Sequence, residues 1–209
     1  MNKRQKKKKL KQHIKQLVTK YPWLAPHSAW NGEVVDNYNY TWTELDALPR
    51  GWIKGFGKVF VEELGDAIER AGLTNQYYVA QVKEKYGILS WYDSGGTEET
   101  YNIIRKFEVI SQRVCIFCGR LDVPMLNEGW MSPECYHCFR QRTLKRHPDY
   151  SEEKIREMYQ KYICDEPDEN GNYLIPNSYK VRRTSQGEEQ EITFDIKATV
   201  DKVRKMEVL

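Results

Sequence analysis

Residues 115–138, CIFCGRLDVPMLNEGWMSPECYHC, contain two Cys-x2-Cys pairs separated by 16 residues. Two residues between cysteines allow a tight turn that points both sulfur atoms at one ion, and Gly119 permits such a turn. A loop of this length can bring the two pairs together. The spacing therefore predicts one structural zinc ion per chain, bound by Cys115, Cys118, Cys135 and Cys138. Four thiolates leave no open coordination position, so we expect the metal to stabilise the fold rather than to activate water.

Other uses of these cysteines remain open. The chain has five cysteines and no secretion signal is expected at its N-terminus, which favours a reducing compartment over disulfide bonds. Four separately packed thiols, a redox dithiol and an iron–sulfur cluster are the alternatives to zinc. His137 could also replace one thiolate ligand. The fifth cysteine, Cys164, is expected to be a partly buried apolar residue.

The residues before the cysteines predict a helix, two strands and a second helix. Apolar residues recur at helical spacing from Lys58 onward. Residues 77–82 and 88–92 have strand character on either side of a turn at 83–87. Thr97, which two glutamates follow, suits the N-cap of the next helix. We therefore expect an α+β fold with a small helix–hairpin–helix core and an inserted four-cysteine zinc knuckle or ribbon.

Four segments are expected along the chain. They are a basic N-terminal arm (1–20), an α+β core (21–112), a zinc knuckle module (113–147) and a C-terminal helix with short strands that pack on the core (148–209). Within the last segment, the pattern predicts a helix from Ser151, strands at 173–175 and 191–196, and a final helix at 199–209.

Charge is distributed unevenly along the chain. Nine of the 33 Lys and Arg residues lie in residues 1–20, which hold no acid, so a net charge of +3 conceals an acidic body of net charge −6. This basic arm is expected to contact nucleic acid, to contact a protein partner, or to be a solvated tail. Four arginines near the cysteines can offset the charge of a zinc–thiolate centre. The residues expected to contact nucleic acid or a partner protein are Lys6, Lys7, Lys8, Lys9, Arg113, Arg120, Arg140 and Arg142.

Residues 81–92, QVKEKYGILSWY, followed by a helix and by Cys115-x2-Cys118-Gly119 and Cys135-x2-Cys138, resemble a family of mostly uncharacterised phage and prophage proteins. The resemblance spans about residues 50–140, and it departs from the family pattern at Trp91, where that pattern has Phe or Tyr. It implies residence in the cytoplasm of a bacterial host. It also implies that the protein handles nucleic acid or inhibits a host defence such as a CRISPR effector.

Motifs for catalysis are missing from the sequence. It contains no P-loop, dinucleotide-binding, nucleophile-elbow or zinc-protease motif, and its four histidines offer few candidates for acid–base chemistry. No stretch approaches the roughly 18 apolar residues of a membrane-spanning helix. We therefore expect a non-enzymatic zinc protein that docks on a nucleic-acid-handling protein. Direct DNA or RNA binding and a zinc-containing nuclease are the alternatives, and the oligomeric state stays open.

Overall fold

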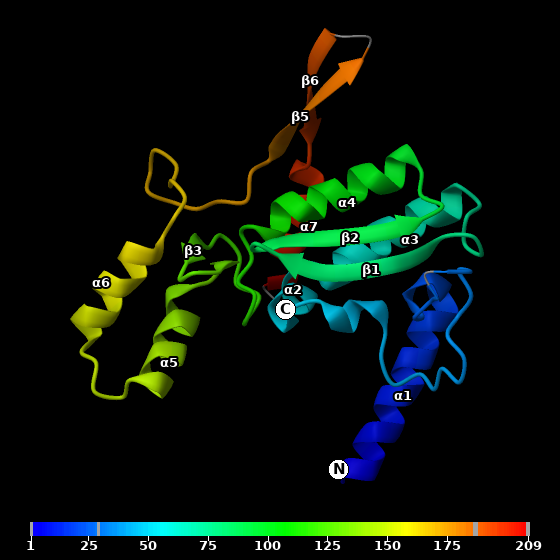
Figure 1. The fold of residues 1–209 in the computed structure, drawn as a ribbon, viewed down its shortest axis with the longest axis horizontal. Helices are drawn as coiled ribbons and strands as arrows, with labels where there is room; N and C mark the ends of the chain where they lie inside the picture. Colours follow the sequence, from blue (N-terminus) through cyan, green and yellow to red (C-terminus); the bar gives the residue numbers. More distant parts are fainter. Residues whose placement is uncertain (1, 29, 186–187, 208–209) are drawn as a thin grey trace.

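The computed structural model describes residues 2–28, 30–185 and 188–207, and it confirms the mixed α+β class (Figure 1). Its α-helices are α1 (Lys3–Lys20), α2 (Arg50–Trp52), α3 (Lys58–Arg70), α4 (Glu98–Ser111), α5 (Tyr136–Arg146), α6 (Glu152–Tyr162) and α7 (Lys197–Glu207). Short helices of other types are η1 (Pro22–Leu24), η2 (Glu44–Ala47) and η3 (Ile53–Gly57). The strands are β1 (Tyr78–Lys85), β2 (Ile88–Ser94), β3 (Met125–Asn127), β4 (Met131–Pro133), β5 (Ser178–Ser185) and β6 (Glu188–Asp195), paired as three antiparallel hairpins.

The β1–β2 hairpin has a tighter turn than the sequence predicts. The expectation of a turn at 83–87 is wrong, because β1 continues through Lys85 and only Tyr86 and Gly87 connect the strands. Both connecting residues have positive φ angles, 53° and 78°. This is the backbone of a two-residue turn whose twist matches that of the flanking strands. Lys83 therefore belongs to the strand, on the face that carries Lys85.

Helices α3 and α4 pack against the other face of this hairpin, as the arrangement in Figure 1 shows. Phe60 of α3 meets the ring of Trp91 on β2 edge-on, with centroids 4.9 Å apart. The same Phe60 ring lies 4.9 Å from Phe107 of α4. Each large side chain removed from water in this way stabilises the fold by about 1.5–3 kcal/mol. Thr97 caps α4 as predicted, since its hydroxyl accepts a hydrogen bond from the Thr100 N–H.

Helix α1 contacts the body through its second half. Its start is capped by Asn2, whose side chain accepts a hydrogen bond from the Gln5 N–H at 2.9 Å. Residues 2–13 are all exposed, whereas Ile14 is buried and Leu17 packs against the core. Figure 1 shows the first half of the helix projecting away from the rest of the molecule.

Residues 50–70 form one continuous helical run made of α2, η3 and α3. Its middle part, η3, is a π-helical turn, a local widening that is often found at functional sites. Trp52 and Phe56 of this run are completely buried in the core.

The C-terminal residues divide between two hydrophobic clusters. Ile155 and Tyr159 of α6 pack with Phe139 of α5 in a small cluster beside the cysteines. Val200 and Val203 of α7 instead join the main core. Helix α6 thus packs on α5 rather than on the main core, and we call residues 113–165 together the cysteine module.

Two details of the C-terminal prediction need correction. Residues 173–175 form no strand, and the strand predicted at 191–196 pairs instead with β5, which begins at Ser178. The final helix begins at Lys197, and the predicted residues 208–209 lie outside the described part of the chain. Among the described helices, none is long and apolar enough to cross a membrane.

Candidate metal centre

The first cysteine pair lies on a tight turn directly after α4. The Cys115 N–H donates to the Arg120 carbonyl at 2.8 Å, and the Gly119 N–H donates to the Cys115 carbonyl at 3.0 Å. Gly119 has a φ of +87°, a conformation that L side chains rarely adopt. The turn therefore depends on glycine at this position, as the sequence predicts, and it places Cys115 and Cys118 on one side.

The second pair lies at the start of α5. Cys135 is the N-cap of this helix and Cys138 is in its first turn. The partial positive charge of a helix N-terminus favours thiolates at these positions. The hairpin of β3 and β4 returns the chain between the two pairs, and the Ile116 N–H donates to the Pro133 carbonyl at 3.0 Å, which holds the turn against the hairpin.

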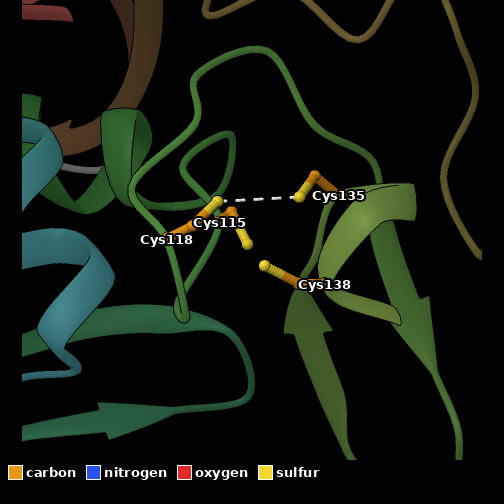
Figure 2. Close-up of side chains that lie close together, drawn as sticks. All are labelled: Cys115, Cys118, Cys135 and Cys138. Carbon is orange, nitrogen blue, oxygen red and sulfur yellow. Dashed lines mark hydrogen bonds between the residues drawn. The ribbon is translucent and has the colours of Figure 1, made fainter. Parts of the chain in front are cut away.

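The four sulfur atoms converge on one point (Figure 2). All of them lie within 4.8 Å of one another, and the Sγ atoms of Cys118 and Cys135 are 3.6 Å apart. Four thiolates bound at about 2.3 Å to a tetrahedral zinc ion would have sulfur atoms about 3.8 Å apart. Cys115 and Cys135 are buried, whereas Cys118 is exposed and Cys138 is half-buried. The structure thus brings all four predicted ligands into a group that can hold a metal ion.

These thiols cannot all ionise unless a cation balances their charge. The hydrogen bond between Cys115 and Cys135 lowers the pKa of Cys115 and raises the pKa of Cys135. Burial, followed by the negative charge of Cys115, raises the pKa of Cys138. A divalent metal ion removes this conflict by binding all four side chains as thiolates. The donor set therefore fits a metal ion.

Two glycines allow the helical run 50–57 to lie directly against the first cysteine turn. A Cβ atom on Gly51 would lie 2.1 Å from the Cys115 carbonyl oxygen, and one on Gly55 would lie 2.9 Å from the Gly119 carbonyl oxygen. The indole N–H of Trp52 donates to the Val114 carbonyl at 2.9 Å. This contact was not predicted, although the Gly-x3-Gly spacing of Gly51 and Gly55 on a helix is a signal for it in the sequence. The metal centre is consequently built against the main core.

Three of the four arginines expected to meet a partner are ion-paired with carboxylates of the cysteine module. The pairs are Arg113–Asp165, Arg140–Glu152 (2.6 Å) and Arg142–Glu134 (2.8 Å). Glu134 is 1% exposed and precedes the ligand Cys135, so Arg142 balances a buried charge next to the centre. Arg120 is exposed and lines a hollow of about 260 Å³ beside Cys118. These ion pairs therefore neutralise the charges of three of the four arginines that were expected to meet a partner.

The remaining predicted contact residues lie elsewhere. Lys6, Lys7, Lys8 and Lys9 are exposed on the projecting half of α1, which Figure 1 places away from the cysteine module. His137 is exposed on α5 and is not among the converging ligands. The expectation for Cys164 is wrong, because this residue is exposed.

Comparisons with models of protein families, with curated proteins and with solved structures give no match to this chain. What the protein does must therefore follow from the metal centre and from its surfaces.

Proposed function

We propose that the four cysteines bind one zinc ion per chain as a structural metal. Tetrahedral thiolate sites select zinc or iron–sulfur clusters, and a two-residue spacing within each pair is typical of zinc knuckles. A centre with four protein ligands holds segments together without an open position for a substrate. This supports a non-enzymatic role for the metal.

We further propose that the protein binds nucleic acid through the first half of α1. The observation that carries this proposal is the exposure of residues 2–13, which contain seven Lys and Arg residues and no acid. Nucleic acid is bound by neutralising its phosphates, and the released counter-ions make the affinity depend steeply on salt. Ile14 and Leu17 anchor the helix to the body, so its basic half is presented at a fixed place.

Binding to labelled DNA and RNA, measured by fluorescence anisotropy over a range of salt concentrations, tests this proposal. Replacing Lys6, Lys7, Lys8 and Lys9 together by glutamine should weaken binding and reduce the slope of log K against log[salt] by about one for each phosphate that is no longer neutralised. A matched control replaces four exposed basic residues on α5, α6 and α7, namely Lys145, Arg146, Lys161 and Lys205. Equal effects of the two sets would refute a specific role for α1.

Docking on a nucleic-acid-handling protein is the second candidate. The net charge of −6 outside residues 1–20 supports it, because an acidic body suits the basic groove of such an enzyme. The same proposal includes a phage-type protein in the bacterial cytoplasm that inhibits a host defence such as a CRISPR effector. Adding the purified chain to a purified effector should then block DNA binding by the effector, and the α1 glutamine variant should inhibit equally well.

The same purified protein can be tested for nuclease activity. Incubation of supercoiled plasmid with the zinc-loaded protein and Mg²⁺ should leave the plasmid intact. Nicking that disappears on replacement of His137 and His147 would establish an enzyme instead.

A further inference from the structure

Two exposed aromatic rings stack on each other where the cysteine module meets the main core. The ring centroids of Tyr86 and Trp130 are 5.3 Å apart with an angle of 29° between the ring planes. Each residue is 54% exposed, although large aromatic side chains contribute most to stability when they are buried. Tyr86 lies in the turn of the β1–β2 hairpin, and Trp130 lies in the connection between β3 and β4. The pair therefore joins two hairpins that are distant in sequence.

The stacked rings are held in place by hydrogen bonds and by close backbone packing. The Glu84 carboxylate accepts hydrogen bonds from the Trp130 indole N–H at 3.2 Å and from the Gly87 N–H at 2.5 Å. A Cβ atom on Gly87 would lie 2.5 Å from the Met125 sulfur, so the two hairpins approach closely. The rings are thus ordered on the surface before any ligand arrives.

One lysine lies beside the stacked pair, and a second lysine lies beside another exposed ring of the β1–β2 hairpin. The Lys85 Nζ lies 5.7 Å from the Tyr86 ring centroid, and the Lys83 Nζ lies 5.1 Å from the ring centroid of Tyr92. Tyr92 is 47% exposed and lies opposite Gln81, about four residues, or roughly 13 Å, from the turn. Lys83 also donates a hydrogen bond to the side-chain carbonyl of Gln81 at 2.7 Å, which does not neutralise the charge of the lysine. Tyr86 at the turn and Tyr92 further along β2 are thus exposed rings that each have a lysine beside them.

We propose that this face of the β1–β2 hairpin binds single-stranded nucleic acid, with bases stacked on the Tyr86–Trp130 pair and on Tyr92, and with phosphates near Lys83 and Lys85. This pattern of stacking rings and basic side chains is the one by which proteins bind single strands without sequence preference. A duplex keeps its bases paired and stacked inside, so it has no base to offer these rings. The inference rests on the proposed nucleic-acid binding and adds a second contact that selects single strands.

The choice of nucleic acid over a protein partner follows from charge. The lysines lie directly beside the rings, and the projecting half of α1 supplies a second cationic surface on the same molecule. Glu84, the acid that contacts the stacked pair, is engaged by its hydrogen bonds to Trp130 and Gly87. An anionic ligand with flat, apolar groups at regular intervals therefore complements this face.

Anisotropy titrations of the full zinc-loaded chain with labelled oligothymidylate and with a labelled duplex test this inference. Replacing Trp130 or Tyr86 by leucine should each weaken oligothymidylate binding at least about 5-fold, and duplex binding should change less than about 2-fold. Tyr101→Leu on α4, a ring that is 47% exposed away from this face, is the matched control and should change neither affinity. Zinc content and melting temperature of each variant identify loss of fold.

A second variant, with Lys83 and Lys85 replaced by glutamine, keeps all the rings and should weaken oligothymidylate binding with a smaller salt slope. Unchanged single-strand affinity in the folded ring and lysine variants would overturn the inference, whether or not α1 proves to bind nucleic acid. Loss of single-strand binding in these variants, with full binding in the α1 glutamine variant, would support the inference and refute the role of α1. If the ring variants instead lose only binding of a purified protein partner, the face is a protein interface and the inference is wrong.

Discussion

Substitution of Gly51 by alanine should loosen the cysteine turn from the main core. A methyl group at this position would lie 2.1 Å from the Cys115 carbonyl oxygen. It would also lie 2.5 Å from the carbonyl carbon and 2.6 Å from the carbonyl oxygen of Ile116. All three atoms belong to the backbone, so no side chain can rotate to make room. The hydrogen bond from the Gly51 N–H to the Ile116 carbonyl, 2.9 Å long, would lengthen or break at the same time.

The size of this effect follows from the kind of atom that must move. Overpacking of a well-filled interior costs about 1–3 kcal/mol. The broken hydrogen bond adds about 1 kcal/mol, so we expect a loss of about 2–4 kcal/mol in the free energy of unfolding. For a chain of this size the melting temperature should fall by roughly 4–16 °C. Because the displaced backbone carries a metal ligand, the variant should also release zinc to a chelator faster than the parent protein.

Gly57→Ala is the control for helix propensity. This glycine lies inside the same helical run, at the end of η3, and a Cβ atom there would meet its first neighbour, in the Ile53 side chain, at an ordinary 3.6 Å. Alanine should therefore stabilise the protein there by about 0.5–1 kcal/mol. Thermal unfolding followed by circular dichroism, with zinc release monitored by a chromogenic chelator, measures both effects. A Gly51→Ala protein that melts and releases zinc like its Gly57→Ala counterpart would falsify the close contact.

Elemental analysis should give one zinc ion per chain, and Cys115→Ser should lose it while Cys164→Ser retains it; acid should release the metal because protonated thiols do not bind zinc. Burial alone would raise the pKa of Glu63, but hydrogen bonds from Lys106, Lys202 and Thr199 hold it below its usual value. A lowered carboxyl pKa stabilises the folded state above the unfolded-state pKa, and this stability is lost as the pH falls through the folded-state pKa. Glu63→Gln should therefore be less stable than the parent at neutral pH, with a difference that shrinks in melting curves taken below about pH 4.5. The exposed Glu62→Gln should show no such dependence, and a constant difference for Glu63→Gln would contradict the ion pairs.

Local signals in the sequence predict the elements and ligands that depend on neighbouring residues alone. Thr97 caps its helix because the capping hydrogen bond is made three residues away. The four metal ligands follow from spacing, since a knuckle is set by a few consecutive residues and one glycine. The strand predicted at 173–175 is wrong, because strand formation depends on a partner elsewhere in the chain. The partner of β6 is β5, which begins only at Ser178.

Contacts that depend on distant parts of the chain were not predictable in the same way. A two-residue turn with positive φ usually contains Asn or Gly at its first position. Tyr86 occupies this position here, so the sequence gives no signal for the two-residue turn. Trp130 shows its role only beside Tyr86, a residue of another hairpin. The close approach of Gly51 to Cys115 likewise arises between segments more than sixty residues apart.

The like charges on the first half of α1 make the stability of this helix depend on bound anions and on salt. Lys3 and Lys7, Arg4 and Lys8, and Lys7 and Lys11 are each four residues apart, and such pairs repel each other on a helix. Phosphates bound along this surface would remove the repulsion, so winding of the helix and ligand binding are coupled equilibria. Added salt should therefore have opposite effects on the arm, raising its helical content while lowering its affinity for the ligand.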